Sequence, residues 1–146
     1  MTDSDNSSDS TGFFSTIAES ECRELLSVGA IGRIAFNSDS GIQLLPLNYL
    51  YLDGAVYCRV GAASVLAELA DGSDDVAFGV DYVEELFKDA WSVLVTGSIR
   101  AVTESDEMAK LLGQRKLEPW AIGDRQLYLR IEPVTLTGRR VKRNAR

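Results

Sequence analysis

Residues 42–60 read IQLLPLNYLYLDGAVYCRV, two apolar runs joined by Asp53 and Gly54. An Asp-Gly pair between apolar runs is the strongest short-range signal for a β-hairpin, because both residues tolerate the positive φ angles of a two-residue turn. Pro46 has no N–H to donate to a β-ladder, so it predicts a sheet edge or a bulge. The sequence therefore predicts a hairpin whose first strand leaves some backbone unpaired and free to face a ligand.

The stretch RVGAASVLAEL at residues 59–69 passes from a predicted strand into a predicted helix. Small residues, the Ser64 hydroxyl and the free N–H groups of a helix N-terminus are suited to holding a phosphate. Ser64 is equally suited to being a plain helix cap. Arg59 either supplies the cation for a phosphate or is a surface residue of the strand. Both interpretations stay open, because the stretch contains no lysine.

The remainder of the chain favours short strands separated by small helices. A helix is predicted before Gly29, with Thr16 and Glu19 as a capping box, and a second helix is predicted to have Ser105 as its cap. Residues 82–90 are predicted to form an irregular connection. Further strands are predicted at residues 31–36, 75–81, 91–104 and 126–141. This order indicates a mainly β protein with short helices, in which an antiparallel sheet closes into a barrel, rather than a parallel doubly wound sheet.

The chain has 146 residues, which fits one domain. Residues 1–12, MTDSDNSSDSTG, are too polar to bury apolar surface and are predicted to be a disordered acidic tail. Residues 13–141 are predicted to be the folded domain, and residues 142–146 a basic tail.

The formal net charge of −7 argues against nucleic-acid binding, which depends on clustered Lys and Arg. The basic run at residues 139–146 is interpreted as a solvated tail rather than a nucleic-acid arm. No apolar run approaches the length of a membrane span, and the N-terminal residues do not resemble a signal peptide. We therefore expect a cytoplasmic protein with no nucleic-acid or membrane partner.

The chain contains no histidine. This excludes Ser-His-Asp and Cys-His nucleophile activation, as well as histidine-ligated zinc and haem. Cys22 and Cys58 lack metal-type spacing and are predicted to be reduced core residues. An enzyme built on this sequence would therefore take its chemistry from a bound organic cofactor.

Four stretches in the same order resemble the pyridoxamine 5′-phosphate oxidase-like family of FMN-binding split barrels, in its small actinobacterial branch. The resemblance covers roughly residues 17 to 141. The stretches are SECRELLSVGAIGRIAF (20–36), LLPLNYLYLDGAVYCRV (44–60), WSVLVTGSIRAV (91–102) and PWAIGDRQLYLRIEPVTLTGRRV (119–141).

The resemblance implies a six-stranded antiparallel split β-barrel that works as a homodimer with two flavins at the subunit interface. It implies that one strand lies along the isoalloxazine ring with its backbone, that the stretch 59–65 holds the phosphate, and that Trp120 approaches from the partner chain. The strand residues are Pro46, Leu47, Asn48 and Tyr49, and the phosphate residues are Arg59, Val60, Ser64 and Val65.

The sequence also departs from the family. Relatives commonly place a lysine at the position of Val65, and loss of one charge-assisted partner weakens phosphate binding by about tenfold to a hundredfold. The arginine-histidine pattern that reads the substrate in the vitamin B6 oxidase is missing. We therefore expect a small FMN-dependent oxidoreductase that does not act on pyridoxamine phosphate, with a small-molecule substrate and a nicotinamide cofactor as electron donor. The alternatives are a non-catalytic binding or regulatory barrel with weakened flavin binding, and a deazaflavin-dependent reductase.

Overall fold

The computed structural model describes residues 13–86, 89–117 and 126–142. Most of these residues lie in β-strands, and the helices are short. In chain order the elements are β1 (Phe13–Thr16), α1 (Glu19–Val28), β2 (Ile31–Ser38), β3 (Gly41–Asn48), β4 (Leu50–Leu52), β5 (Ala55–Gly61), the 3₁₀ helix η2 (Val65–Asp71), β6 (Ser73–Glu84), β7 (Asp89–Ala101), α2 (Ser105–Leu111), the 3₁₀ helix η3 (Arg115–Leu117) and β8 (Gln126–Lys142).

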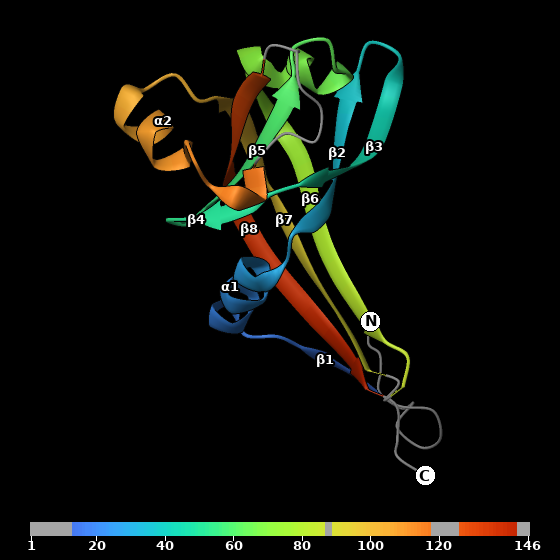
Figure 1. Ribbon diagram of the computed structural model, residues 1–146. Coiled ribbons are helices and arrows are strands. Elements are labelled where there is room, and N and C mark those ends of the chain that lie inside the picture. The colour runs from blue at the N-terminus through green and yellow to red at the C-terminus, as the bar shows by residue number, and fades with distance from the viewer. Residues whose placement is uncertain (1–12, 87–88, 118–125, 143–146) are drawn as a thin grey trace.

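The strands form one antiparallel sheet in the order β3-β2-β6-β7-β8-β5-β4, with β1 added to β8. The sheet curls until β3 contacts β5, and these two strands are not neighbours in the ladder (Figure 1). The structure is therefore a split barrel, as predicted. The strand count differs, because the short strands β1 and β4, of four and three residues, join six strands of seven residues or more.

The hairpin predicted at Asp53 and Gly54 is confirmed. These residues have φ angles of 52° and 82° between the paired ends of β4 and β5. Two positive φ angles in a two-residue loop define a type I′ turn, whose twist matches that of the strands. Pro46 lies opposite Arg33 on β3, at the end of the strand order, so the predicted edge position is also confirmed.

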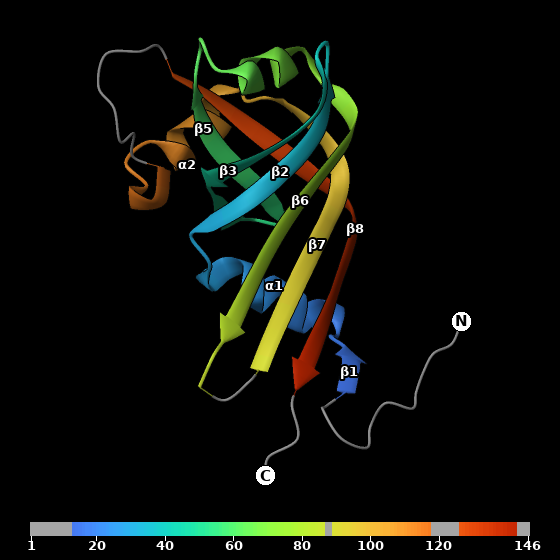
Figure 2. The ribbon, with the colours of Figure 1, turned by 90° about the vertical axis from the view of Figure 1, so that its right-hand side faces the viewer.

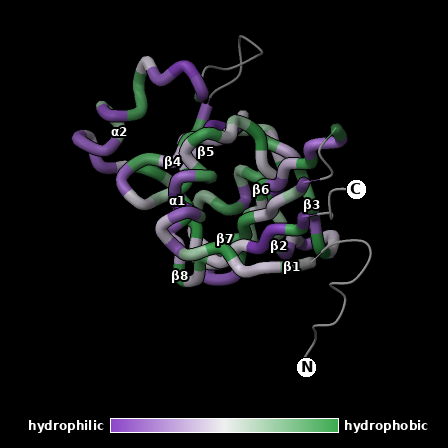
Figure 3. Tube along the Cα trace, turned by 90° about the horizontal axis from the view of Figure 1, so that it is seen from below, coloured by the Kyte–Doolittle hydropathy of each residue, from purple (hydrophilic) through white to green (hydrophobic). Residues whose placement is uncertain are grey.

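Two apolar clusters stabilise the fold. The larger fills the barrel, and the smaller lies where α2 and η3 cover the outer surface of β5 and β8. Hydrophobic residues recur along the strands around the interior, whereas hydrophilic residues predominate along α2 (Figure 3). Cys22 and Cys58 are buried and free, as predicted. β5 is buried on both faces because it lies between the two clusters.

Both predicted side-chain caps are wrong. The residue that caps α1 is Ala18, which makes no side-chain cap bond, and Thr16 instead pairs with Arg139 in the sheet. α2 is capped by Glu104, whose carboxylate accepts the Glu107 N–H at 2.9 Å. In each case the pattern lay within two residues of the true boundary. Strand pairing of Thr16 sets the start of α1, and the neighbouring Glu104 sets the start of α2.

The irregular connection predicted for residues 82–90 is wrong as well. β6 continues to Glu84 and β7 begins at Asp89, so the two strands form a long hairpin that extends past α1 (Figures 1 and 2). Tyr82 and Trp91 pair across it with their rings stacked 6.2 Å apart. Cross-strand pairing, which no local pattern shows, continues the ladder. β8 reaches Lys142, the first residue of the predicted basic tail, and residues 1–12 and 143–146 lie outside the described residues.

Replacing Gly54 with alanine should lower the free energy of unfolding by about 1 kcal/mol, because an L side chain is strained in the left-handed region. No heavy atom lies within 4 Å of the new Cβ, so the cost is conformational alone. Asp53→Asn is the matched control. It keeps a residue that tolerates positive φ and loses only the exposed ion pair with Lys110. Equal destabilisation in urea of both variants would contradict the assignment.

Candidate functional site

Two Arg–Tyr pairs lie side by side on the outer surface of β5 and β8. Tyr57 is opposite Arg130, and Arg59 is opposite Tyr128. Each guanidinium lies over the ring of its partner, with carbon-to-centroid distances of 5.7 Å for Arg130 and 5.2 Å for Arg59. The two arginines therefore have the same kind of cation–π contact on the same surface.

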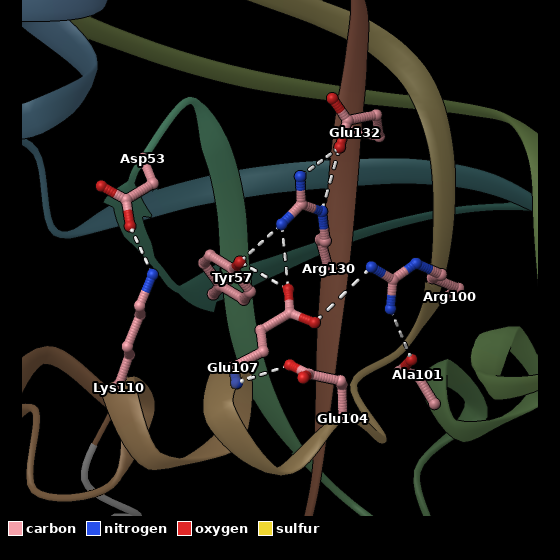
Figure 4. A network of polar contacts seen from close by, with 9 residues as sticks. All are labelled: Asp53, Tyr57, Arg100, Ala101, Glu104, Glu107, Lys110, Arg130 and Glu132. Carbon is pink, nitrogen blue, oxygen red and sulfur yellow. Dashed lines mark hydrogen bonds and ion pairs between the residues drawn. The ribbon is translucent and has the colours of Figure 1, made fainter.

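Arg130 is surrounded by acceptors. Its Nη1 donates to Glu107 Oε2 at 2.9 Å and to the Tyr57 hydroxyl at 2.8 Å, and Glu132 accepts from its Nε at 3.0 Å. Tyr57 donates its own hydroxyl proton to Glu107 Oε2 at 2.6 Å. Arg100 lies 3.5 Å from the other oxygen of Glu107 (Figure 4). The network binds α2, which carries Glu107, to β5, β7 and β8.

The protonation states of this network are fixed at neutral pH. Hydrogen bonds from Tyr57 and Arg130 lower the pKa of Glu107, so it is a carboxylate. Burial, followed by the hydrogen bond to Glu107, raises the pKa of Tyr57 to about 12, so it keeps its proton. Because the donors and acceptors of these groups are used within the network, it serves to hold α2 in place.

Arg59 differs from Arg130 in its partners. Among the described residues it forms no ion pair, and its Nη1 donates only to the Leu117 carbonyl at 3.4 Å. Its Nε is buried and has no hydrogen-bond partner in this part of the chain. Buried donors are nearly always paired, so this unpaired Nε sets Arg59 apart from Arg130.

The residues that follow Arg59 form the turn into η2. The Ser64 hydroxyl accepts the Leu66 N–H at 3.1 Å, so the interpretation of Ser64 as a helix cap is confirmed. This bond uses an acceptor position of the hydroxyl and leaves its proton available as a donor. Val60 is buried and Val65 is half-buried against the barrel core, so both side chains serve packing.

Residues 46–49, the segment predicted to lie along the isoalloxazine ring, divide into a part near the surface and a buried part. Pro46 is exposed on β3, and Leu47 and Asn48 are half-buried. Tyr49 is fully buried, donates its hydroxyl to the Leu26 carbonyl at 2.6 Å and meets the Phe78 ring edge-on at 5.0 Å. Burial raises the pKa of Tyr49 to about 12. The side chain of Tyr49 thus belongs to the core and is not available to a ligand.

An uncovered face lies beside this segment, on the side of the sheet away from the core. We name it the outer face. Its two central rows are Leu44-Ala35-Ala77-Thr96-Thr135 and Pro46-Arg33-Gly79-Leu94-Thr137. The five strands that carry it lie side by side in Figure 2. Two hollows open on it, of about 530 Å³ around Leu94 and about 440 Å³ around Ala77.

The predicted site residues that the structure describes lie on two segments. Residues 59–65 run from β5 into η2, and residues 46–49 run from β3 to β4; the parent strands β3 and β5 contact each other where the barrel closes. Trp120 lies outside the described residues. The sequence analysis missed the Arg130 network, although two Tyr-x-Arg tripeptides, at 57–59 and 128–130, were visible. Paired antiparallel, they place each arginine opposite a tyrosine.

Other kinds of site find no support within the described residues. No group of three or more acidic or cysteine side chains is arranged there to hold a metal ion. None of the helices there has the length and apolar character needed to span a bilayer.

The family model described as pyridoxamine 5′-phosphate oxidase matches residues 18–140. The chain belongs to this family. The uncharacterised protein Rv0080 of Mycobacterium tuberculosis is 29% identical over 130 residues, which cover 86% of this chain and 84% of the relative. A candidate pyridoxamine 5′-phosphate oxidase from Corynebacterium glutamicum has a similar structure, with a TM-score of 0.74, 27% identity, and coverage of 90% of this chain and 96% of that one. An FAD-binding protein from Mycobacterium smegmatis is similar at a TM-score of 0.73 and 26% identity, with coverage of 87% and 97%.

Acidification should weaken the Arg130 network in a way that depends on Glu107. The pKa of Glu107 in the folded protein is below its ordinary value of 4.5, so its stabilising effect is present above that value and is lost as the pH falls toward the folded pKa. Urea unfolding from pH 7 to pH 3 should show a steeper loss of stability in the natural protein than in Glu107→Gln. Parallel curves for the two proteins would contradict this role.

Proposed function

We propose that this family member binds FMN with the phosphate at Arg59 and acts as a small flavin-dependent oxidoreductase. The observation that carries the proposal is the contrast between two arginines on one surface. Arg130 has carboxylate partners, whereas Arg59 has none among the described residues and keeps a buried Nε without an acceptor. A phosphate would supply that acceptor in a charge-assisted bond.

The surrounding residues fit the rest of such a ligand. The Ser64 hydroxyl keeps a proton to donate in the turn five residues after Arg59, and the edge strand at Pro46–Asn48 offers backbone to a flat ring. The similar M. smegmatis structure is that of an FAD-binding protein, which supports a flavin as the ligand class. When bound, a flavin accepts and delivers hydride at N5. The role of this chain is to bind and orient it beside a small-molecule substrate, with a nicotinamide cofactor as electron donor.

A second candidate is a regulatory barrel with weak flavin binding. It is favoured by Val65, which packs on the core where relatives commonly place a lysine, and by the use of Ser64 as a cap. A deazaflavin is a third candidate, because its tail also carries a phosphate group for Arg59.

We further propose that a second copy of the chain covers the outer face. Leu44 and Leu94 are 63% and 45% exposed there, and Ile42 and Val134 at its margin are 79% and 76% exposed. Small residues such as Ala77 between them allow a second sheet to approach closely. Contiguous apolar surface of this kind is typical of interfaces, and a twofold axis pairs such a face with itself.

Arg59→Met should weaken FMN binding by about tenfold to a hundredfold, because a charge-assisted bond to the phosphate contributes about 1.5–3 kcal/mol. Riboflavin, which lacks the phosphate, should change much less. Methionine keeps an apolar stem over Tyr128, and both affinities are read from flavin fluorescence. Arg23→Met, an exposed arginine on α1 that is paired with Glu19, is the control and should change neither affinity. Equal weakening of FMN and riboflavin, or no binding by the natural protein at millimolar FMN, would overturn the proposal.

Leu94→Arg should convert the dimer into a monomer, because it would bury an unpaired charge at the centre of the proposed interface. Light scattering at micromolar concentration measures the mass, and a flavin titration of the same sample tests whether binding depends on the dimer. Leu112→Arg is the matched control, since Leu112 is 61% exposed at the end of α2 and lies off the outer face. A monomeric natural protein, or a Leu94→Arg variant that stays dimeric, would contradict the assignment of this face.

A further inference from the structure

The carbonyl groups at the C-terminal end of α1 accept hydrogen bonds from a residue far away in the sequence. A helix leaves its last carbonyls without intrahelical donors, and the last turn of α1 has no basic residue. Lys116, 87 residues beyond Gly29 in the chain, supplies the missing cation. Its Nζ donates to the Ser27 carbonyl at 3.0 Å and to the Gly29 carbonyl at 2.8 Å. Within the described residues Lys116 forms no ion pair, so these two carbonyl oxygens are the hydrogen-bond acceptors of its ammonium group there.

The same helix end is packed tightly against Tyr49. A Cβ on Gly29 would lie 2.3 Å from the Tyr49 hydroxyl oxygen, so no larger residue fits without a shift. The Tyr49 hydroxyl donates to the Leu26 carbonyl, and its backbone N–H donates to the Ala30 carbonyl at 3.0 Å. The end of α1 therefore holds Tyr49, the last residue of the segment 46–49, whose other three residues pair with β2.

Lys116 lies in the short helix η3, whose next residue contacts the other half of the candidate site. Leu117 is buried in the smaller apolar cluster, and its carbonyl accepts the bond from Arg59. η3 thus contacts the end of α1 through Lys116 and the guanidinium of Arg59 through Leu117. It connects the two segments that the proposed function assigns to the ring and to the phosphate.

We propose that Lys116 is a positioning residue that holds residues 46–49 in a fixed relation to Arg59. This inference rests on the proposed function, because it concerns a ligand that spans both segments. A ligand that contacts two regions binds only to protein molecules in which both regions are correctly placed. Its apparent affinity therefore falls in proportion to the fraction of such molecules. A ligand that touches one region is insensitive to their relation. Lys116 should therefore affect FMN more than riboflavin, although it touches neither.

The test compares Lys116→Met with Arg115→Met. Methionine keeps the unbranched stem of Lys116 and removes its charge, and Arg115 is an exposed residue of the same turn, so its variant controls for net charge. We expect the Kd of FMN to rise by about three- to tenfold in Lys116→Met, with riboflavin and inorganic phosphate unchanged. Arg115→Met should match the natural protein, and Lys116→Arg, which can still donate to two carbonyls, should restore FMN binding.

Unchanged FMN binding in Lys116→Met, or equal weakening of FMN and riboflavin, would overturn the inference, since equal weakening indicates general loosening. Hydrogen exchange of the Tyr49 amide gives a readout without flavin. It should be faster in Lys116→Met than in Arg115→Met, because the helix end that holds Ala30 loses its donor. If the natural protein binds no flavin, the proposed function fails. In that case equal exchange in both variants would separately overturn the role of Lys116.

Discussion

The register between β5 and β8 is the constraint on which the rest of the structure depends. It places Val56 and Cys58 inside the barrel, where both are fully buried, and Tyr57 and Arg59 outside it. Because side chains alternate along a strand, a slip of one residue would put Arg59 into the barrel core. Burying that unpaired charge would cost so much free energy that the shifted register is excluded. The same register creates both Arg–Tyr pairs and the surface on which α2 packs.

The two arginines of that surface show how the fold and the proposed site share one framework. Burying Arg130 is compensated by Glu107, and through Glu107 it secures α2. Arg59, by contrast, has its Nε removed from solvent without a hydrogen-bond acceptor among the described residues. Natural proteins tolerate such a local deficit where a ligand removes it, since elsewhere packing would favour an apolar side chain. The proposed phosphate would remove this deficit at Arg59.

Local sequence chemistry predicted the features that local chemistry controls. The Asp53-Gly54 turn and the Ser64 cap depend on a few consecutive residues, and both are confirmed. The caps proposed at Thr16 and Ser105 failed because strand pairing and the neighbouring Glu104 set those helix starts. The Arg130 network and the outer face could not be derived, because both require knowing which strands are neighbours and in what register. The prediction of a flavin ligand came from the family resemblance, because no residue pattern in this chain specifies a flavin.

Val65 contributes packing in this chain. It is half-buried against the barrel core at the start of η2 and carries no charge. Arg59 is therefore the only cation between residues 59 and 71. It is held in place by the Tyr128 ring and the Leu117 carbonyl, so the proposed contact with a phosphate would cost little side-chain entropy. In the proposed complex, the affinity of this barrel for its ligand would depend on how firmly η3, with Leu117 and Lys116, is held against the rest of the fold.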